Sequence, residues 1–141
     1  MFTLGGGAIS WRSAKQSCIA DSTMEAEYVV ASEAAEEAVW LRNFLLDVKV
    51  VPSLQSAIVI YCDNSGAVAN AREPRADSKG KHIERKYHLI REIVQRGDVV
   101  VTKIASKDIL ADPFTKCLPT KVFEGHLEGL GIRCMASWVL E

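Results

Sequence analysis

Three acidic residues lie in apolar surroundings, where a carboxylate needs a specific partner. Glu27 falls in a helical pattern, Asp63 ends the most apolar segment of the chain, and Asp112 lies in Ile109–Lys116. Burying a carboxylate is costly unless a positive group meets it. These acids are therefore the candidates for chemistry, and together they form one pattern: a Glu on a long helix, an Asp at a strand end and an Asp on a late helix.

Helical geometry distinguishes Glu27 from its neighbours. Residues three or four apart share a helix face, so Glu27 lies on the side that carries apolar residues. These are Ala31, Ala34, Ala38, Leu41 and Leu45. We expect this stripe to pack against a sheet, with Glu27 at its buried end. The alternative is a helix-end Glu that reaches solvent or pairs with a lysine.

Asp63 and Asp112 also have two interpretations each. In α/β sheets, ligands collect beyond the carboxyl ends of the strands, where Asp63 is expected. Alternatively, Asp63-Asn64 makes the turn and caps the next helix, as Asx residues commonly do. Asp112 is either a site carboxylate on a late short helix or an ordinary surface acid before Pro113.

The elements that must position these acids follow from sequence patterns. Their order predicts a single α/β domain. We expect a hairpin over residues 2–12 around Gly5-Gly6-Gly7, followed by a helix from Ser22 to about Val48 and a strand over Ala57–Cys62. Next come a short helix over Ser65–Ala71 and a helix that bears Ile83, Tyr87, Ile90 and Val94 and stops at Gly97. A strand over Val99–Ile104, a short helix from Ser106 through Asp112 and a tail, residues 120–141, with one helix complete the chain.

Composition is that of an ordinary globular protein, with 48% hydrophobic and 25% charged residues and a net charge of −1. The net charge does not indicate a nucleic-acid partner. The four cysteines lack the close pairing of zinc ligands, so we expect free thiols in a reducing compartment. Residues 1–5 have no signal-peptide pattern and no segment is apolar enough to span a membrane. An intracellular protein of the cytoplasm or nucleus is expected.

Five segments, in order and in register, resemble the ribonuclease H region of copia-type LTR retrotransposon Pol polyproteins. They are Ile9–Gln16, Ser22–Tyr28, Tyr61–Asn64, Lys81–Ile83 with Tyr87–Glu92, and Leu110–Lys116. The resemblance runs from about residue 2 to 119. It implies a ribonuclease H-like α/β domain over residues 1–119, with a mixed sheet flanked by helices, followed by the helical tail.

The resemblance also implies an activity and a site. The family cleaves the RNA strand of RNA–DNA hybrids with Mg²⁺, or with Mn²⁺, and it is joined to reverse transcriptase in the rest of the polyprotein. Glu27, Asp63 and Asp112 match three of the four family carboxylates. Clustered carboxylates hold two hard cations about 3.5–4 Å apart, one activating water and the other stabilising the leaving oxygen. We expect the three acids to converge as catalytic and metal-binding residues.

The fourth family carboxylate lies on a central strand that precedes the hairpin, and no Asp or Glu occurs here before Asp21. We therefore expect a sheet that lacks this strand, a chain that is inactive by itself, and self-association through the open edge. Two alternatives remain: a non-catalytic retroelement remnant, and a co-opted module that binds nucleic acid or protein.

A local excess of basic residues suggests a substrate surface. The candidates are Arg72, Arg75, Lys79, Lys81, His82, Arg85 and Lys86. These side chains could meet the phosphates of an RNA–DNA hybrid or of another nucleic acid. The alternative is a solvated helix face whose charges are balanced by neighbouring acids.

Overall fold

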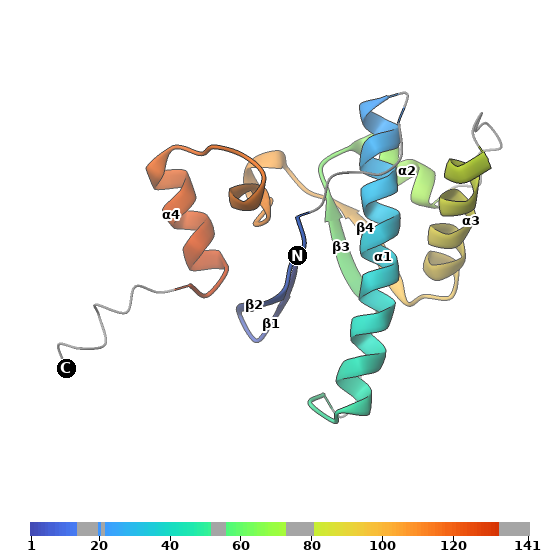
Figure 1. Cartoon of the computed structure of the whole chain (residues 1–141), viewed down its shortest axis with the longest axis horizontal. Coiled ribbons are helices and arrows are strands. Elements are labelled where there is room, and N and C mark those ends of the chain that lie inside the picture. Colours follow the sequence, from blue (N-terminus) through green and yellow to red (C-terminus); the bar gives the residue numbers. More distant parts are fainter. Residues whose placement is uncertain (14–19, 21, 52–55, 73–80, 133–141) are drawn as a thin grey trace. The chain divides into compact units, whose positions relative to one another are not determined.

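The computed structural model describes residues 1–13, 20, 22–51, 56–72 and 81–132, without the side chains of residues 81–85 and 87. The chain divides into two compact units (Figure 1). The hairpin unit combines Met1–Lys15 with Asp108–Glu141, and the helical unit is Gln16–Lys107. Helices and strands are mixed in the chain, as the predicted α/β class requires. The predicted domain boundary after residue 119 stays a prediction.

The hairpin unit begins with the expected hairpin. Strands β1 (Phe2–Leu4) and β2 (Gly7–Ser10) pair antiparallel. The turn between them places Gly5 at φ 60° and Gly6 at φ 82°, a left-handed conformation at both central positions that glycine adopts without steric cost. Trp11 and Arg12 were expected in the second strand but follow it.

Helix α4 (Thr120–Gly129) is the helix expected in the tail, and its C-terminal end is joined to the hairpin. The amide of Ala8 donates a hydrogen bond to the Leu130 carbonyl at 3.1 Å, and Leu130 is only 1% exposed. Gly131 has φ 71°, and a Cβ atom there would lie 2.6 Å from the carbonyl oxygen of Gly6. Only glycine therefore permits this approach of two backbones.

The short helix predicted from Ser106 through Asp112 is wrong. The structure has two separate 3₁₀ turns instead, η1 (Ser106–Asp108) and η2 (Asp112–Phe114). A helix this short forms few hydrogen bonds to offset the conformational entropy lost by the residues that it orders. Pro113 has no backbone N–H to donate, and it disfavours helical backbone angles at the preceding Asp112. Phe114 of η2 stacks on Trp11, with ring centroids 6.2 Å apart.

In the helical unit, the long helix α1 (Thr23–Asp47) matches its predicted limits. Ser22 caps it by accepting a hydrogen bond from the Glu25 amide at 3.2 Å. Of the predicted apolar stripe, Ala31, Ala38 and Leu41 are buried, while Ala34 and Leu45 are only partly covered. The buried face is wider than the stripe and includes Tyr28, Val29, Ser32 and Ala35.

Strands β3 (Ile58–Cys62) and β4 (Val99–Lys103) pair in parallel with Ile60 opposite Val101. Among the described residues, each has the other as its one strand partner. A helix layer on both faces was expected, but within the described part of the helical unit no helix covers one of the two faces. Ile60, Cys62, Val99 and Val101 are buried, whereas Val59, Tyr61 and Val100, which alternate with them, are exposed.

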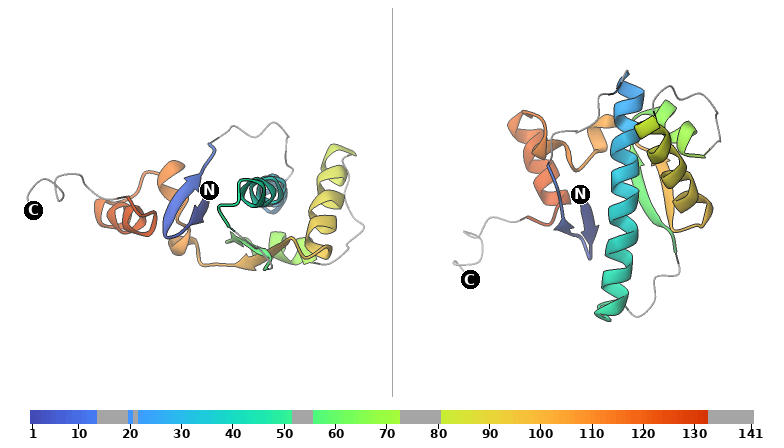
Figure 2. Two further views of the ribbon diagram at one scale, coloured as in Figure 1. Left: turned by 90° about the horizontal axis from the view of Figure 1, so that it is seen from below. Right: turned by 45° about the vertical axis from the view of Figure 1, so that its right-hand side comes forward.

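Helices α2 (Ser65–Arg72) and α3 (Lys81–Gln95) connect the two strands, and α3 lies beside α1 (Figures 1 and 2). Ser32 donates a hydrogen bond to the Lys86 carbonyl at 3.2 Å, and the Lys86 ammonium pairs with Glu33. As predicted, α3 stops just before Gly97, which has φ 77°. Arg42 of α1 then binds Asp98 at 2.8 Å, ahead of β4.

No helix within the described ranges is both long and apolar enough to cross a membrane.

Two glycines associated with α4 make a matched test of the hairpin unit. Gly131→Ala should destabilise the chain by several kcal/mol, because it adds a strained positive φ and a backbone clash. Gly125→Ala should be neutral or stabilise by up to about 1 kcal/mol, since it lies within α4 with open space around it. Urea unfolding of both variants measures this. Equal effects of the two substitutions would contradict the backbone contact at Gly131.

Candidate metal site

The sequence left open whether Asp63-Asn64 caps the next helix or offers a site carboxylate, and in the structure each residue takes one of these roles. The side-chain oxygen of Asn64 accepts a hydrogen bond from the Ala67 amide at 3.1 Å and so caps α2. The cap therefore comes from Asn64, and the Asp63 carboxylate is available at the carboxyl end of β3. The Lys103 ammonium, at the end of β4, donates to the backbone carbonyl of Asp63 and holds this turn against the neighbouring strand.

Glu27, Cys62 and Asp63 form one cluster. A carboxylate oxygen of each acid and the Cys62 Sγ all lie within 4.8 Å of one another. Glu27 comes from the second turn of α1, where the helix passes over the end of β3. Sequence reasoning selected both acids, but it treated Cys62 only as a free thiol. The alternation of the strand could have found it, because Cys62 shares the buried face of Ile60.

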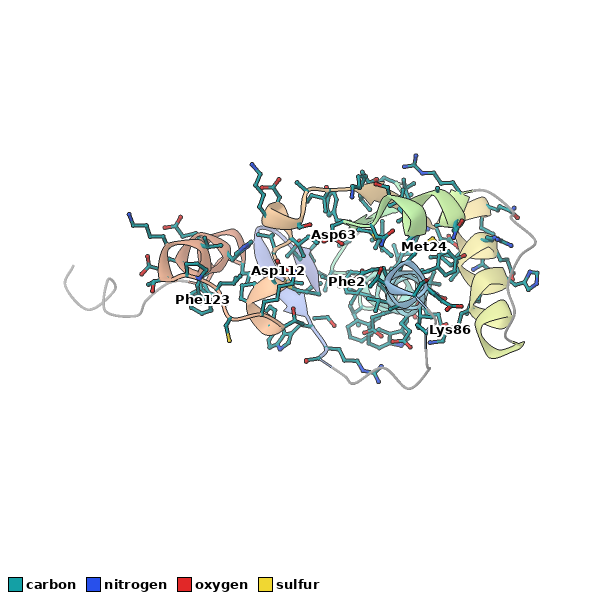
Figure 3. All side chains as sticks on the ribbon, turned by 90° about the horizontal axis from the view of Figure 1, so that it is seen from above. Phe2, Met24, Asp63, Lys86, Asp112 and Phe123 are labelled. Atoms are coloured by element: carbon teal, nitrogen blue, oxygen red, sulfur yellow. The ribbon has the colours of Figure 1, made fainter. Side chains whose placement is uncertain are left out.

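Helices α1 and α2 approach each other closely beside the cluster of Glu27, Cys62 and Asp63. A Cβ atom at Gly66 would lie 2.8 Å from the Met24 Sδ and 3.3 Å from the Asn64 side-chain oxygen. Asn70 of α2 donates a long hydrogen bond to the same sulfur at 3.6 Å. Figure 3 labels Met24 and Asp63 in this part of the helical unit. Glycine at the start of α2 thus makes room for the first turns of α1.

Burial raises the pKa of the Cys62 thiol, and the nearby Glu27 and Asp63 carboxylates raise this pKa further. The Asn64 amide, 3.4 Å from the sulfur, acts in the opposite direction. Because the net shift is upward, the thiol is neutral near pH 7. The negative charge of the cluster therefore comes from its two carboxylates, which are hard oxygen donors of the kind that Mg²⁺, Mn²⁺ and Ca²⁺ prefer.

Asp112 lies in the hairpin unit, at the first position of η2. It is 9% exposed, and its two carboxylate oxygens accept hydrogen bonds from the Lys116 ammonium at 2.9 and 3.0 Å. This ion pair follows from the one-turn spacing of the two residues. Since Asp112 belongs to a different unit from Glu27 and Asp63, the convergence of all three acids stays a prediction.

The predicted basic surface is described only in part. The Arg72 guanidinium donates to the Val101 carbonyl at 2.8 Å, so it ties α2 to β4. Lys86 pairs with Glu33, as described above. Lys81, His82 and Arg85 belong to the first turns of α3, but their side chains are not described, and Arg75 and Lys79 lie outside the described residues. The two described members thus have structural partners within the helical unit.

The thiols allow a test of the cluster's electrostatics. Iodoacetamide should modify exposed Cys117 faster than buried Cys62, because the thiolate is the nucleophile and a raised pKa leaves less of it. Asp63→Asn should speed the modification of Cys62, since it removes a charge that raises the thiol pKa. Glu25→Gln, on the same helix as Glu27, should not. Peptide mapping by mass spectrometry across pH 7–10 measures the alkylation rates of Cys62 and Cys117. If Asp63→Asn leaves the Cys62 rate unchanged, the Asp63 carboxylate does not lie close to this thiol.

Comparison with known proteins finds, among others, three retrovirus-related Pol polyproteins from transposons. The chain is 40% identical over 132 residues to a retrovirus-related Pol polyprotein from transposon TNT 1-94 of Nicotiana tabacum, covering 94% of the chain and 10% of that polyprotein. It is 36% identical to the Pol polyproteins from transposons RE2 and RE1 of Arabidopsis thaliana, over 92% of the chain and 9% of each relative. No family model and no solved structure matches.

These similarities cover nearly the whole chain, although the chain spans only about a tenth of the length of each relative. Both units of the structure are therefore included in the matched region. The chain is therefore similar to one short segment of retrovirus-related Pol polyproteins from transposons.

Proposed function

We propose that the chain is the ribonuclease H-like part of a retrotransposon Pol polyprotein, acting on the RNA strand of an RNA–DNA hybrid. The observation that carries this proposal is the meeting of Glu27 and Asp63 at the carboxyl end of β3. Two acids far apart in the sequence are brought together at the edge where α/β sheets bind their ligands. The Pol relatives supply the context, since a retroelement copies RNA into DNA.

The donor set fits a hard divalent cation. Glu27 and Asp63 provide two charged oxygens, and the neutral Cys62 thiol adds no charge. When bound, Mg²⁺ would activate water and stabilise the leaving oxygen of a phosphodiester. The chain's own residues hold the two carboxylates in place: Asn64 caps α2, and Lys103 fixes the Asp63 carbonyl. Asp112 is proposed as a third ligand, for which the cation would replace Lys116.

Two carboxylates are too few for a two-metal site. Within the described ranges, the cluster contains only these acids and Cys62. We therefore propose that hydrolysis needs Asp112 and one further carboxylate from elsewhere in the polyprotein. Reverse transcriptase and the rest of the polyprotein are the proposed partners, in the cytoplasm or nucleus, and the residues around the start of α3 are the proposed contacts to the hybrid's phosphates.

Metal binding tests the site separately from catalysis. Mn²⁺ should bind the chain and broaden or shift the signals of residues around β3 and the first turns of α1 in NMR spectra. Asp63→Asn and Glu27→Gln should each weaken Mn²⁺ binding roughly tenfold, about 1.4 kcal/mol, because each removes one charged ligand. Glu25→Gln on the same helix should bind as the unsubstituted chain does. Equal affinity in all three variants would show that the cation sits elsewhere.

Cleavage of a labelled RNA–DNA hybrid tests the activity. The chain alone should show no Mg²⁺-dependent turnover, because its described cluster is incomplete. A fusion to the segment that precedes the matched region in the tobacco polyprotein should cleave the RNA strand, and Asp63→Asn should reduce this rate by several orders of magnitude. Hybrid binding by the fusion without any cleavage would favour the non-catalytic alternative.

A further inference from the structure

The outer face of α1 carries two stacked aromatic rings that the other described elements of the helical unit do not cover. Trp40 and Phe44 are one helical turn apart, with ring centroids 5.4 Å apart and planes inclined by 11°. Trp40 is 56% exposed and Phe44 is 47% exposed. Val48 continues the same side of the helix and is also exposed. A helix that buries its opposite face in the core has no structural need of aromatic rings on this one.

Helix α1 is also longer than the strands that it covers. At about 1.5 Å per residue, its 25 residues span roughly 37 Å, whereas a five-residue strand spans about 17 Å. The helix therefore extends past the sheet that it covers, and its C-terminal turns project beyond β3 and β4 (Figures 1 and 2). Trp40 and Phe44 flank Arg42, which binds Asp98 just ahead of β4, so the aromatic pair lies near this end of the strands.

Acidic residues surround the aromatic pair. Glu36, Glu37 and Asp47 are exposed and lie within one or two turns of Trp40 and Phe44 on the same side of α1. Within the part of the chain that the structure describes, none of these three acids forms an ion pair. The nearest base along the helix, Arg42, is turned toward Asp98. The outer face is thus aromatic at its centre and negative around it.

We propose that this face, formed by Glu36, Glu37, Trp40, Phe44 and Asp47, is a docking surface for a basic amphipathic helix of a partner protein. The apolar side of such a helix would cover the two rings, and its arginines would meet the acids. Arginine is favoured over lysine because its planar guanidinium both stacks on an indole ring and pairs with carboxylates. A second copy of this chain is disfavoured, because a two-fold contact through this face would oppose like charges.

A peptide probe tests the chemistry with the whole chain. The probe is a fluorescein-labelled synthetic helical peptide with leucines on one face and arginines along its flanks. Its controls are a peptide of the same composition in scrambled order and one with glutamates replacing the arginines. Fluorescence anisotropy at rising chain concentration should show binding of the first peptide alone, weakening as salt is raised. Equal binding of the glutamate peptide would overturn the proposal.

Surface variants locate the contact without disturbing the core. Trp40→Ala with Phe44→Ala should weaken binding at least tenfold, since central aromatic residues dominate such interfaces. Glu36→Gln, Glu37→Gln and Asp47→Asn together should weaken binding several-fold and flatten its salt dependence. Trp11→Ala with Phe114→Ala is the matched control, because it removes a stacked Trp–Phe pair of the hairpin unit and leaves α1 unchanged.

The control pair should bind the peptide as the unsubstituted chain does. Loss of binding in the control pair as in the α1 pair would overturn the assignment to this face. Concentration-dependent dimerisation abolished by Trp40→Ala with Phe44→Ala, seen by sedimentation without peptide, would also overturn it and identify a second copy as the occupant. Circular dichroism and urea unfolding of each variant confirm that the helical unit remains folded.

Discussion

The parallel pairing of β3 with β4 is the constraint on which the candidate site depends. Parallel strands end at the same edge, so Asp63 after β3 and Lys103 at the end of β4 become neighbours. Such a pair also needs a crossover connection, which α2 and α3 provide. The crossover leaves β3 and turns at once into α2, and this turn places Asn64 at the cap position beside Asp63.

Small side chains then bring α1 onto this arrangement. Ala31, Ala35 and Ala38 are almost fully buried, so the helix backbone can approach the sheet and α3 closely. Ser32 in the same face bonds to the α3 backbone. Because the helix lies so close, the side chain of Glu27 reaches Cys62 and Asp63 at the strand end. Larger residues in the buried face would lift α1 and separate the two acids.

Local patterns were enough to predict the elements of the helical unit. The structure agrees with three such predictions: Ser22 caps the start of α1, Gly97 follows the end of α3, and the two apolar runs form β3 and β4. Of the two acids that helix geometry distinguished, Glu27 joins the cluster at the strand end, although it is not buried there as expected. The presence of Cys62 there follows from strand alternation and was missed because thiols were judged only by their spacing along the chain.

What the sequence left undecided depends on contacts between distant residues. The segment before Asp112 was predicted as a short helix because Ser106 can cap it, whereas the brevity of the segment and Pro113 limit Asp112 to a 3₁₀ turn. The roles of Arg72 and Lys86 could not be seen either, since their partners, Val101 and Glu33, lie far away in the chain. The exposure of Val59, Tyr61 and Val100 on one face of β3 and β4 likewise depends on which elements pack there. An apolar run in the sequence does not predict which elements those are.

The charge of the cluster explains why its two acids are consistent with a binding role and add little to stability. Two carboxylates within 4.8 Å of each other repel by on the order of 1 kcal/mol in water, and roughly four times more at an effective dielectric constant of about 20. The hairpin unit deals with its own buried acid differently, because Lys116 neutralises Asp112 from within the same turn. In the helical unit, Lys103 at the end of β4 donates to the backbone carbonyl of Asp63. The fold therefore brings two carboxylates to one strand end, an arrangement that a divalent cation would stabilise.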